Sequence, residues 1–121
     1  MMTENADTPV TDVDAETVQA WMETRETVVV DVREASEYDF ENIPGSVLLP
    51  LSFLDPDTFP PINDKKVVVV CAVGKRGEAA RKTLANSGID NIFNLVGGLH
   101  AWKQAGYETQ GGKYEVADYD I

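Results

Sequence analysis

The stretch Val-Val-Val-Val-Cys-Ala-Val-Gly-Lys-Arg-Gly occupies residues 67–77 of the chain. Four consecutive valines are typical of a strand that is buried on both faces of a parallel sheet, and the glycines after them predict a tight turn. A helix is expected to begin at Gly77 or Glu78 and to run to about Asn86. The stretch therefore predicts a strand, a loop and a helix in succession, with Cys71 at the carboxyl end of the strand.

Strand and helix patterns alternate along the rest of the chain. Apolar runs predict three further strands, at Thr27–Val32, Val47–Leu49 and Ile92–Leu95. Helical spacing and end signals predict three further helices, at Ala15–Glu23, Ala35–Phe40 and Leu99–Gln104. The proline-rich residues 50–64 predict a loop with at most one helical turn. This alternation favours an α/β fold with a mainly parallel sheet, in which ligands bind beyond the carboxyl ends of the strands.

The chain has 121 residues, a length that suits one domain of ordinary size. Its 43% hydrophobic and 26% charged residues are typical of a globular chain, and no apolar run reaches the roughly 20 residues of a membrane span. Residues 1–9 are interpreted as a polar N-terminal tail without a secretory signal, and residues 108–121 as an acidic C-terminal tail. We therefore expect one domain at residues 10–107, a cytoplasmic location and no membrane partner.

The formal net charge is −11, from 10 lysines and arginines against 21 aspartates and glutamates. Such acidity disfavours a nucleic-acid partner, because phosphate neutralisation needs a basic face. Residues 65–82 differ from the rest, since they hold six lysines and arginines and only Glu78 as an acid. A local positive site in an acidic protein suggests a small anionic ligand. Chance clustering on a solvated surface explains the same pattern equally well.

The chain contains one cysteine and one histidine. A single cysteine excludes an intramolecular disulfide, and Cys71 with His100 cannot complete a cysteine–histidine zinc site. We expect no metal and no cofactor. We interpret His100 as a surface or half-buried helix residue rather than a catalytic base.

The loop after Cys71 has the residue types that an anion-binding nucleophile needs. Backbone N–H groups of a tight turn and of a helix N-terminus can together hold an anion, and a thiol placed there has a lowered pKa. Gly74 is expected to supply a backbone conformation that a side chain forbids, and Gly77 to let the loop close onto the helix. Lys75 and Arg76 add positive charge at the rim. The alternative is an inert cysteine that packs as a small hydrophobic residue.

Two charged residues, Asp31 and Arg33, stand at the end of the first apolar run. We interpret them as an ion pair that ties the strand end to Glu37 or Glu41, because buried charges must be paired. The alternative is that they form a wall of the active site.

Four segments, in order, resemble the signatures of the single-domain rhodanese (thiosulfate sulfurtransferase) family. They are V-V-D-V-R-E at 29–34, E-Y and then N-I-P-G-S at 37–46, C-A-V-G-K-R-G at 71–77, and N-L-V-G-G-L-H-A-W at 94–102. Any one of them alone is a weak signal, whereas four in order at the expected spacing are specific. The resemblance covers about residues 10–107 and implies a rhodanese-like fold, with a central, mainly parallel five-stranded sheet and helices on both faces.

The resemblance also implies an activity. The Cys71 thiolate would attack the outer sulfur of thiosulfate, a small anionic donor, release sulfite and become a persulfide. An acceptor, which is cyanide, a thiol or a protein cysteine, would then take the sulfur. The substrate-binding residues implied are those of the loop, Ala72, Val73, Gly74, Lys75, Arg76 and Gly77. Their backbone N–H groups would hold the sulfur anion, and the lysine and arginine would attract and orient thiosulfate.

Two residues depart from the family pattern. Asn42 stands where the family often has histidine, but this position lies outside the cysteine loop and gives no reason to doubt catalysis. Gly77 stands where the family usually has serine or threonine, and the missing hydroxyl suggests an altered rate or substrate choice. Four residues separate Cys71 from Arg76, against five in related phosphatases and arsenate reductases, so the spacing argues against phosphatase activity. The alternatives to a thiosulfate sulfurtransferase are a sulfur-relay carrier fed by a cysteine desulfurase, a non-catalytic binding domain and a redox thiol.

Overall fold

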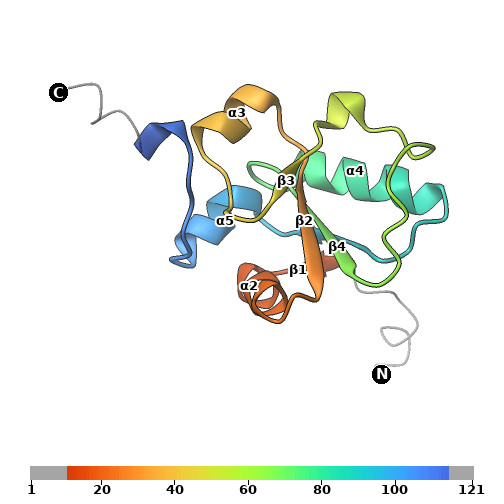
Figure 1. Cartoon of the computed structure of the whole chain (residues 1–121), viewed down its shortest axis with the longest axis horizontal. Coiled ribbons are helices and arrows are strands. Elements are labelled where there is room, and N and C mark those ends of the chain that lie inside the picture. The colour runs from red at the N-terminus through yellow and green to blue at the C-terminus, as the bar shows by residue number, and fades with distance from the viewer. Residues whose placement is uncertain (1–10, 115–121) are drawn as a thin grey trace.

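The computed structural model describes residues 11–114. Its strands form one five-stranded parallel sheet (Figure 1). The strand order is β1-β5-β4-β2-β3, and every neighbouring pair is parallel. The strands are β1 (Asp12–Val13), β2 (Thr27–Asp31), β3 (Val47–Leu48), β4 (Lys66–Val70) and β5 (Ile92–Leu95). The α/β fold with a five-stranded parallel sheet, expected from the sequence pattern and the family resemblance together, is confirmed.

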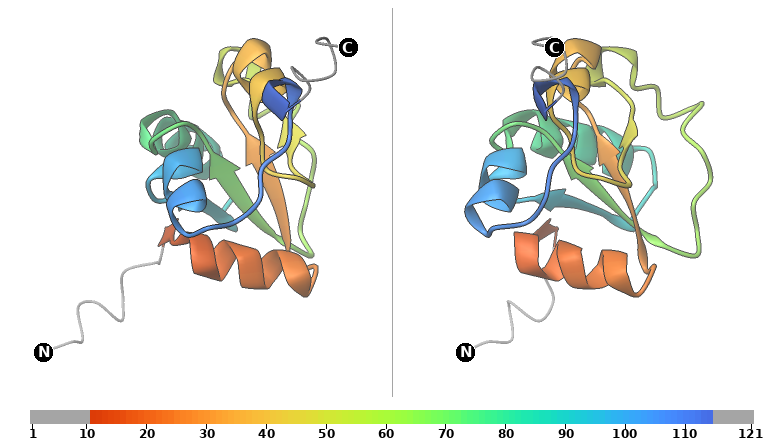
Figure 2. Two further views of the ribbon diagram at one scale, coloured as in Figure 1. Left: turned by 90° about the vertical axis from the view of Figure 1, so that its left-hand side faces the viewer. Right: turned by 60° about the vertical axis from the view of Figure 1, so that its left-hand side comes forward.

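Four α-helices and two short 3₁₀ turns complete the described part of the chain. The helices are α2 (Ala15–Glu23), α3 (Ala35–Phe40), α4 (Lys75–Asn86) and α5 (Gly98–Gln104), and the turns are η1 (Leu51–Phe53) and η2 (Gly112–Tyr114). Figure 2 shows α2 and α4 on different sides of the sheet. None of the helices in residues 11–114 is long and apolar enough to cross a membrane.

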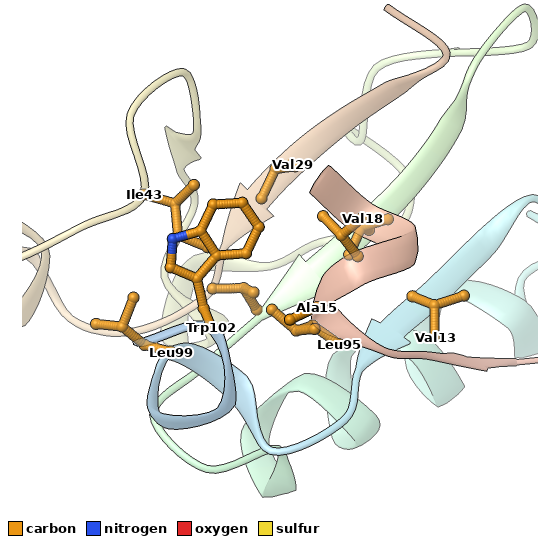
Figure 3. Packing of buried hydrophobic residues seen from close by; sticks show 10 residues of the cluster. Val13, Ala15, Val18, Val29, Ile43, Leu95, Leu99 and Trp102 are labelled. Carbon is orange, nitrogen blue, oxygen red and sulfur yellow. The ribbon is translucent and has the colours of Figure 1, made fainter. Parts of the chain in front are cut away.

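The valines of β4 divide the core into two halves, because alternate side chains of a strand point to opposite faces. Val68 and Val70 pack with residues of α2 and α5, and Figure 3 shows the side chains of this cluster converging. Val67 and Val69 pack with Cys71 and with the buried residues of α4 on the other face. Cys71 therefore lies on the same face as Val67 and Val69, the face covered by α4, and it is only 1% exposed.

Two elements differ from the sequence-based expectations. Strand β1 has only two residues, of which Val13 alone is buried, so it is too short to produce an alternating pattern. Helix α4 begins at Lys75 rather than at Gly77 or Glu78, because Gly74 at its N-cap adopts a left-handed conformation with φ of 108°. The loop after Cys71 is therefore only three residues long, and Lys75 and Arg76 belong to the helix.

Residues 108–114 return to α3 and form a strap across its end. The Asn42 and Gln110 backbones exchange two hydrogen bonds of 2.7 and 2.9 Å, and the Trp102 indole donates to the Glu108 carbonyl oxygen at 2.8 Å. Docked chain thus extends at least to Tyr114, beyond the boundary expected at residue 107. The polar tail expected at 1–9 and the last part of the acidic tail, 115–121, lie outside the described residues.

Glu41 anchors the strap through its buried carboxylate. The Lys103 and Lys113 ammonium groups lie 3.0 and 2.6 Å from the Glu41 carboxylate oxygens, and the Thr109 hydroxyl donates to it. Burial raises the pKa of Glu41, but the hydrogen bonds from Lys113, Thr109 and Lys103 outweigh burial and hold its pKa at about 2.

The start of α5 lies directly against the end of β4. The Leu99 and His100 amides donate to the Cys71 and Ala72 carbonyl oxygens at 2.8 and 3.1 Å. Gly98, with φ of 59°, makes this approach possible, since a methyl group at its Cα would collide with the Cys71 carbonyl oxygen and with Ala72. The start of α5 therefore fixes the position of the Cys71–Ala72 backbone.

We expect the contacts of the Glu41 carboxylate to make the free energy of unfolding decrease as the pH falls into the acid range. The folded pKa of Glu41, about 2, lies below its ordinary value of 4.5, so its contribution is complete above about pH 4.5 and is lost as the pH falls toward 2. Glu41→Gln should lower the free energy of unfolding by up to about 3 kcal/mol at pH 6, and by much less at pH 3. Urea unfolding at both pH values measures this, with exposed Glu23→Gln as control. Equal losses at the two pH values would contradict it.

Gly98→Ala should be far more destabilising than Gly88→Ala. Both glycines have positive φ, but a methyl group at Gly88 meets no atom within 4 Å, whereas one at Gly98 meets the Cys71–Ala72 backbone. Backbone strain alone costs about 1 kcal/mol, and the collision should bring the loss at Gly98 to roughly 3 kcal/mol or more. Denaturant unfolding of the two variants tests this, and losses of similar size would refute the close packing.

Candidate active site

The candidate active site is the turn between β4 and α4, residues 71–74, together with the first turn of α4, residues 75–77. Cys71 follows the last residue of β4, next to the end of β2, because Val70 and Asp31 are partners in the parallel register. The Gly74 amide donates a hydrogen bond to the Cys71 sulfur at 3.0 Å. A donor directed at sulfur stabilises negative charge on it, and the N-terminus of α4 adds the positive end of the helix dipole.

Asn94 of β5 holds the turn from the side, and sequence analysis missed it. Its amide nitrogen donates to the Gly74 carbonyl oxygen at 3.2 Å, which helps to keep Gly74 in its left-handed conformation. Asn94 is buried, and its Oδ1 has no hydrogen-bond partner among the described residues. The available signal was a single amide within the apolar run Ile-Phe-Asn-Leu.

The same side chain accounts for Gly77, where the family resemblance implies serine or threonine. A Cβ atom at Gly77 would collide with Asn94 Oδ1. Gly77 is buried in the first turn of α4, so glycine is the residue that lets this helix approach β5. Gly77 was expected to allow the turn to close onto the helix, and in the structure the side chain that lies close to Gly77 is that of Asn94.

The remaining residues of the turn differ in exposure. Val73 is 60% exposed, Lys75 is exposed, and Ala72 is of intermediate exposure. His100 is exposed on α5, and its backbone amide donates a hydrogen bond to the Ala72 carbonyl oxygen of the turn.

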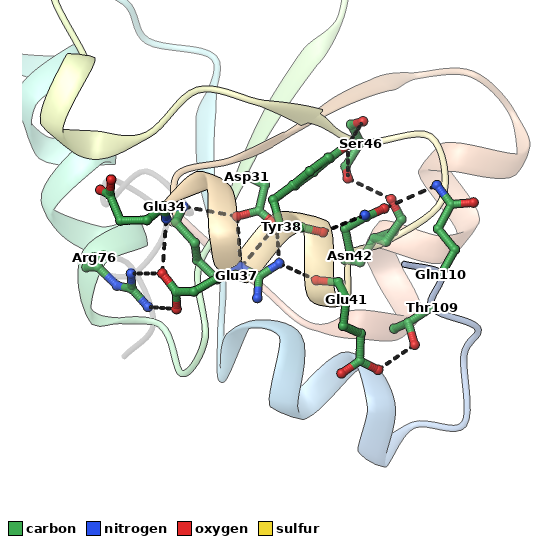
Figure 4. A network of polar contacts seen from close by, with 12 residues as sticks. Asp31, Glu34, Glu37, Tyr38, Glu41, Asn42, Ser46, Arg76, Thr109 and Gln110 are labelled. Carbon is green, nitrogen blue, oxygen red and sulfur yellow. Dashed lines mark hydrogen bonds and ion pairs between the residues drawn. The ribbon is translucent and has the colours of Figure 1, made fainter. Parts of the chain in front are cut away.

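Arg76 is paired with Glu37 of α3. Its two terminal nitrogens donate to the two carboxylate oxygens at 2.7 and 2.9 Å (Figure 4). These hydrogen bonds outweigh desolvation and hold the pKa of Glu37 at about 2. The sequence predicted that Arg76 adds positive charge at the rim of the loop, and the structure pairs this charge with a carboxylate 39 residues earlier in the chain.

Half of the basic residues in the cluster at 65–82 are paired with carboxylates. Besides Arg76, Lys66 pairs with Glu26 at 3.0 Å, and Arg81 pairs with Glu78 at 2.8 Å. Lys75, at the start of α4, makes no ion pair within residues 11–114. Two acids from outside the cluster, Glu26 and Glu37, therefore weaken the positive site of the sequence but leave it positive.

Asp31 and Arg33 form a buried ion pair below the turn. The Arg33 Nε and Nη2 atoms lie 2.9 and 2.8 Å from the Asp31 carboxylate oxygens, and Nη2 also donates to the Glu41 carbonyl oxygen at 2.6 Å. The pair thus connects the end of β2 to the end of α3 (Figure 4). The link runs through the backbone of Glu41, not through either of the carboxylates considered from the sequence.

No group of three histidine, cysteine, aspartate or glutamate side chains within residues 11–114 is arranged to hold a metal ion. The arrangement at Cys71 instead provides a sulfur atom, a backbone donor directed at it and a helix N-terminus. Its chemical capacity is to hold negative charge on sulfur.

Comparison with known proteins identifies several relatives. A Synechocystis protein that has not been characterised is 39% identical over 93 residues, which are 77% of this chain and 52% of that protein. The thiosulfate:glutathione sulfurtransferase of Saccharomyces cerevisiae is 35% identical over 92 residues, covering 65% of this chain and 66% of that one. YrkF of Bacillus subtilis, named as a candidate sulfur carrier protein, is 31% identical over 74 residues. The match with YrkF covers 61% of this chain. This chain spans only about half of the length of the Synechocystis protein and 40% of the length of YrkF.

Solved structures agree in fold. A rhodanese-related protein from Thermoplasma volcanium superposes with a TM-score of 0.72 at 31% identity, covering 83% of this chain and 97% of that one. A rhodanese-like domain protein from Staphylococcus aureus gives a TM-score of 0.71 at 28% identity, covering 85% and 99%. The family model of the rhodanese-like domain matches residues 14–105, which include every helix and strand described here except β1 and the η2 turn. The chain therefore belongs to the rhodanese-like domain family.

Proposed function

We propose that the protein is a sulfurtransferase that moves a sulfane sulfur from thiosulfate or another persulfide donor to a thiophilic acceptor, through a persulfide on Cys71. The observation that carries the proposal is the hydrogen bond from the Gly74 amide to the Cys71 sulfur, at the carboxyl end of β4 and before the N-terminus of α4. Sulfurtransferases among the relatives support it.

The first half-reaction loads the cysteine. The Cys71 thiolate forms a bond to the outer sulfur of thiosulfate, while the bond between that sulfur and the sulfite group breaks. The electron pair of the broken bond leaves with sulfite. The Gly74 amide, which donates to the Cys71 sulfur, and the N–H groups of the first turn of α4 would stabilise the charge on the transferred sulfur, as in an oxyanion hole. Lys75 supplies the nearby positive charge that meets an anionic donor.

The second half-reaction unloads the cysteine. A nucleophilic acceptor, which is cyanide in an assay or a thiol or protein cysteine in a cell, forms a bond to the outer sulfur of the persulfide. Cys71 leaves with the electron pair as a thiolate. The two steps balance without an oxidant or a reductant, and their covalent intermediate implies ping-pong kinetics.

The second candidate is a sulfur-relay carrier that receives its sulfur from a cysteine desulfurase and passes it to a partner protein. Two observations favour it. YrkF, a relative, is named as a candidate sulfur carrier protein. The pairing of Arg76 with Glu37 also removes the second cation on which binding of free thiosulfate would depend. Both candidates use the same persulfide and differ in the donor.

Intact-protein mass spectrometry after incubation with thiosulfate tests the persulfide. We expect a gain of one sulfur atom that cyanide or a thiol removes. Cys71→Ser should show no gain, because Cys71 is the only cysteine of the chain. The variant should unfold at a denaturant concentration close to that of the wild type, since the two residues have nearly the same size.

The donor and the mechanism are separated by the outcome. A gain seen only with a cysteine desulfurase and free cysteine would favour the relay carrier over the thiosulfate enzyme. A gain that persists in Cys71→Ser, or no gain with either donor, would contradict the proposed function.

A further inference from the structure

Glu37 lies beside the first turn of α4, where three hydrogen bonds hold its carboxylate. It is the third residue of α3, where its Oε1 accepts the Glu34 backbone amide at 3.0 Å, while the Glu34 side chain caps the helix in return. The Glu37 carboxylate also receives both terminal nitrogens of Arg76. Moving it away would break three hydrogen bonds at once, so its charge is a fixed part of the site rather than a mobile surface charge.

The charge of Glu37 opposes the charge of Arg76 at the position from which a donor must reach Cys71. Arg76 is close enough to Cys71 for their charges to interact, and the pKa of Arg76 is raised first by its hydrogen bonds with Glu37 and to a smaller extent by Cys71. A donor anion at the turn is attracted by Arg76 and repelled by Glu37, so the pair attracts it less than Arg76 alone would. Lys75, the Gly74 amide and the dipole of α4 add further attraction.

Repulsion from one fixed carboxylate grows in proportion to the charge of the donor. Thiosulfate carries two negative charges, whereas an organic persulfide or an alkanethiosulfonate carries one. The energetic penalty is thus about twice as large for thiosulfate.

From this charge arrangement we propose that Glu37 is a specificity-determining residue, which biases the Cys71 site against dianionic donors and toward monoanionic sulfane-sulfur donors such as organic persulfides. The inference rests on the proposed function and names the substrate class of that same site. Glu37 acts through Arg76 and through its own charge, and it takes no part in bond formation.

The test compares two donors that present the same kind of outer sulfur, bonded to a sulfonyl group, and differ by one charge. They are thiosulfate and methanethiosulfonate, with cyanide as the acceptor and thiocyanate as the measured product. In the second reaction the Cys71 thiolate takes the outer sulfur and methanesulfinate leaves with the electron pair. Steady-state kinetics at low ionic strength give kcat and KM for each donor.

Glu37→Gln keeps the shape of the side chain and an acceptor for the Glu34 amide but removes the charge. It should lower the KM for thiosulfate about fivefold and that for methanethiosulfonate only about twofold, with kcat changed little. Its preference for thiosulfate over the monoanion should rise accordingly, and added salt should shrink the effect. Glu34→Gln removes an equal charge from the same helix end without touching Arg76, and it should change both KM values by less than about twofold.

Glu37→Asp separates charge from structure. It shortens the side chain and disturbs the pairing geometry but retains the negative charge, so it should keep the wild-type preference between the donors. A merely structural role of Glu37 predicts that the aspartate and glutamine variants lose activity alike, with no change in donor preference.

The outcomes distinguish the inference from the proposed function. Thiocyanate formation from both donors, with a donor preference that Glu37→Gln leaves unchanged or shifts toward the monoanion, overturns the inference alone. No thiocyanate from either donor, with wild-type or variant protein, overturns the inference. If Cys71 also gains no sulfur from a cysteine desulfurase and free cysteine, the proposed function falls with it. The expected shift toward thiosulfate in Glu37→Gln, absent in Glu34→Gln and Glu37→Asp, supports both.

Discussion

Two backbone hydrogen bonds, from the Leu99 and His100 amides to the Cys71 and Ala72 carbonyl oxygens, hold the end of β4 against the start of α5. The geometry of the active-site turn depends on this contact. It requires a glycine at position 98, since any side chain there would enter the space of the Cys71–Ala72 backbone. Asn94 secures the other side of the turn through the Gly74 carbonyl oxygen. The backbone around Cys71 is thus held by hydrogen bonds on both sides, from main-chain amides of α5 and from the Asn94 side chain, and such support fixes the geometry of a site.

The charged residues around the turn form one connected arrangement rather than separate pairs. Helix α3 presents Glu37 to Arg76 near its beginning, and the buried Arg33 and the 108–114 strap meet at Glu41, directly after its end. A short helix with no buried residue of its own is therefore held by polar contacts at both ends. The charge that faces the donor consequently depends on contacts made far from Cys71, including those with the C-terminal strap.

The sequence predicted most of the sheet and the position of Cys71 at the end of β4, because these depend on local patterns. The valine runs of β2 and β4 and the position of Cys71 directly after a buried strand are visible without tertiary information. Strand β1 is too short to produce such a pattern. The special conformation of Gly74 was expected from the sequence, but its position as the N-cap, which makes α4 begin at Lys75, was not.

The electrostatics of the site were harder to predict, because the partners lie far apart in the chain. Arg76 and Glu37 are 39 residues apart, and Asn42 and Gln110 are 68 residues apart. The basic window at 65–82 suggested either an anion site or chance clustering on the surface, and the structure pairs two of its cations, Lys66 and Arg76, with acids from elsewhere in the chain. The departure at Asn42 has a structural counterpart in its pairing with the strap, and the departure at Gly77 has one in the buried Asn94 side chain.

If sulfur passes through a persulfide on Cys71, the persulfide must form and react at least as fast as the whole reaction turns over. Measuring the rate at which the persulfide loses its sulfur therefore tests the mechanism. Protein loaded with radiolabelled sulfane sulfur, freed of donor and mixed rapidly with cyanide, would be sampled for label on Cys71 and in thiocyanate. The account predicts that label leaves Cys71 at least as fast as the steady-state turnover, and that it all enters thiocyanate. Label that leaves Cys71 more slowly than turnover, or that remains on the protein while thiocyanate forms from added donor, would contradict it.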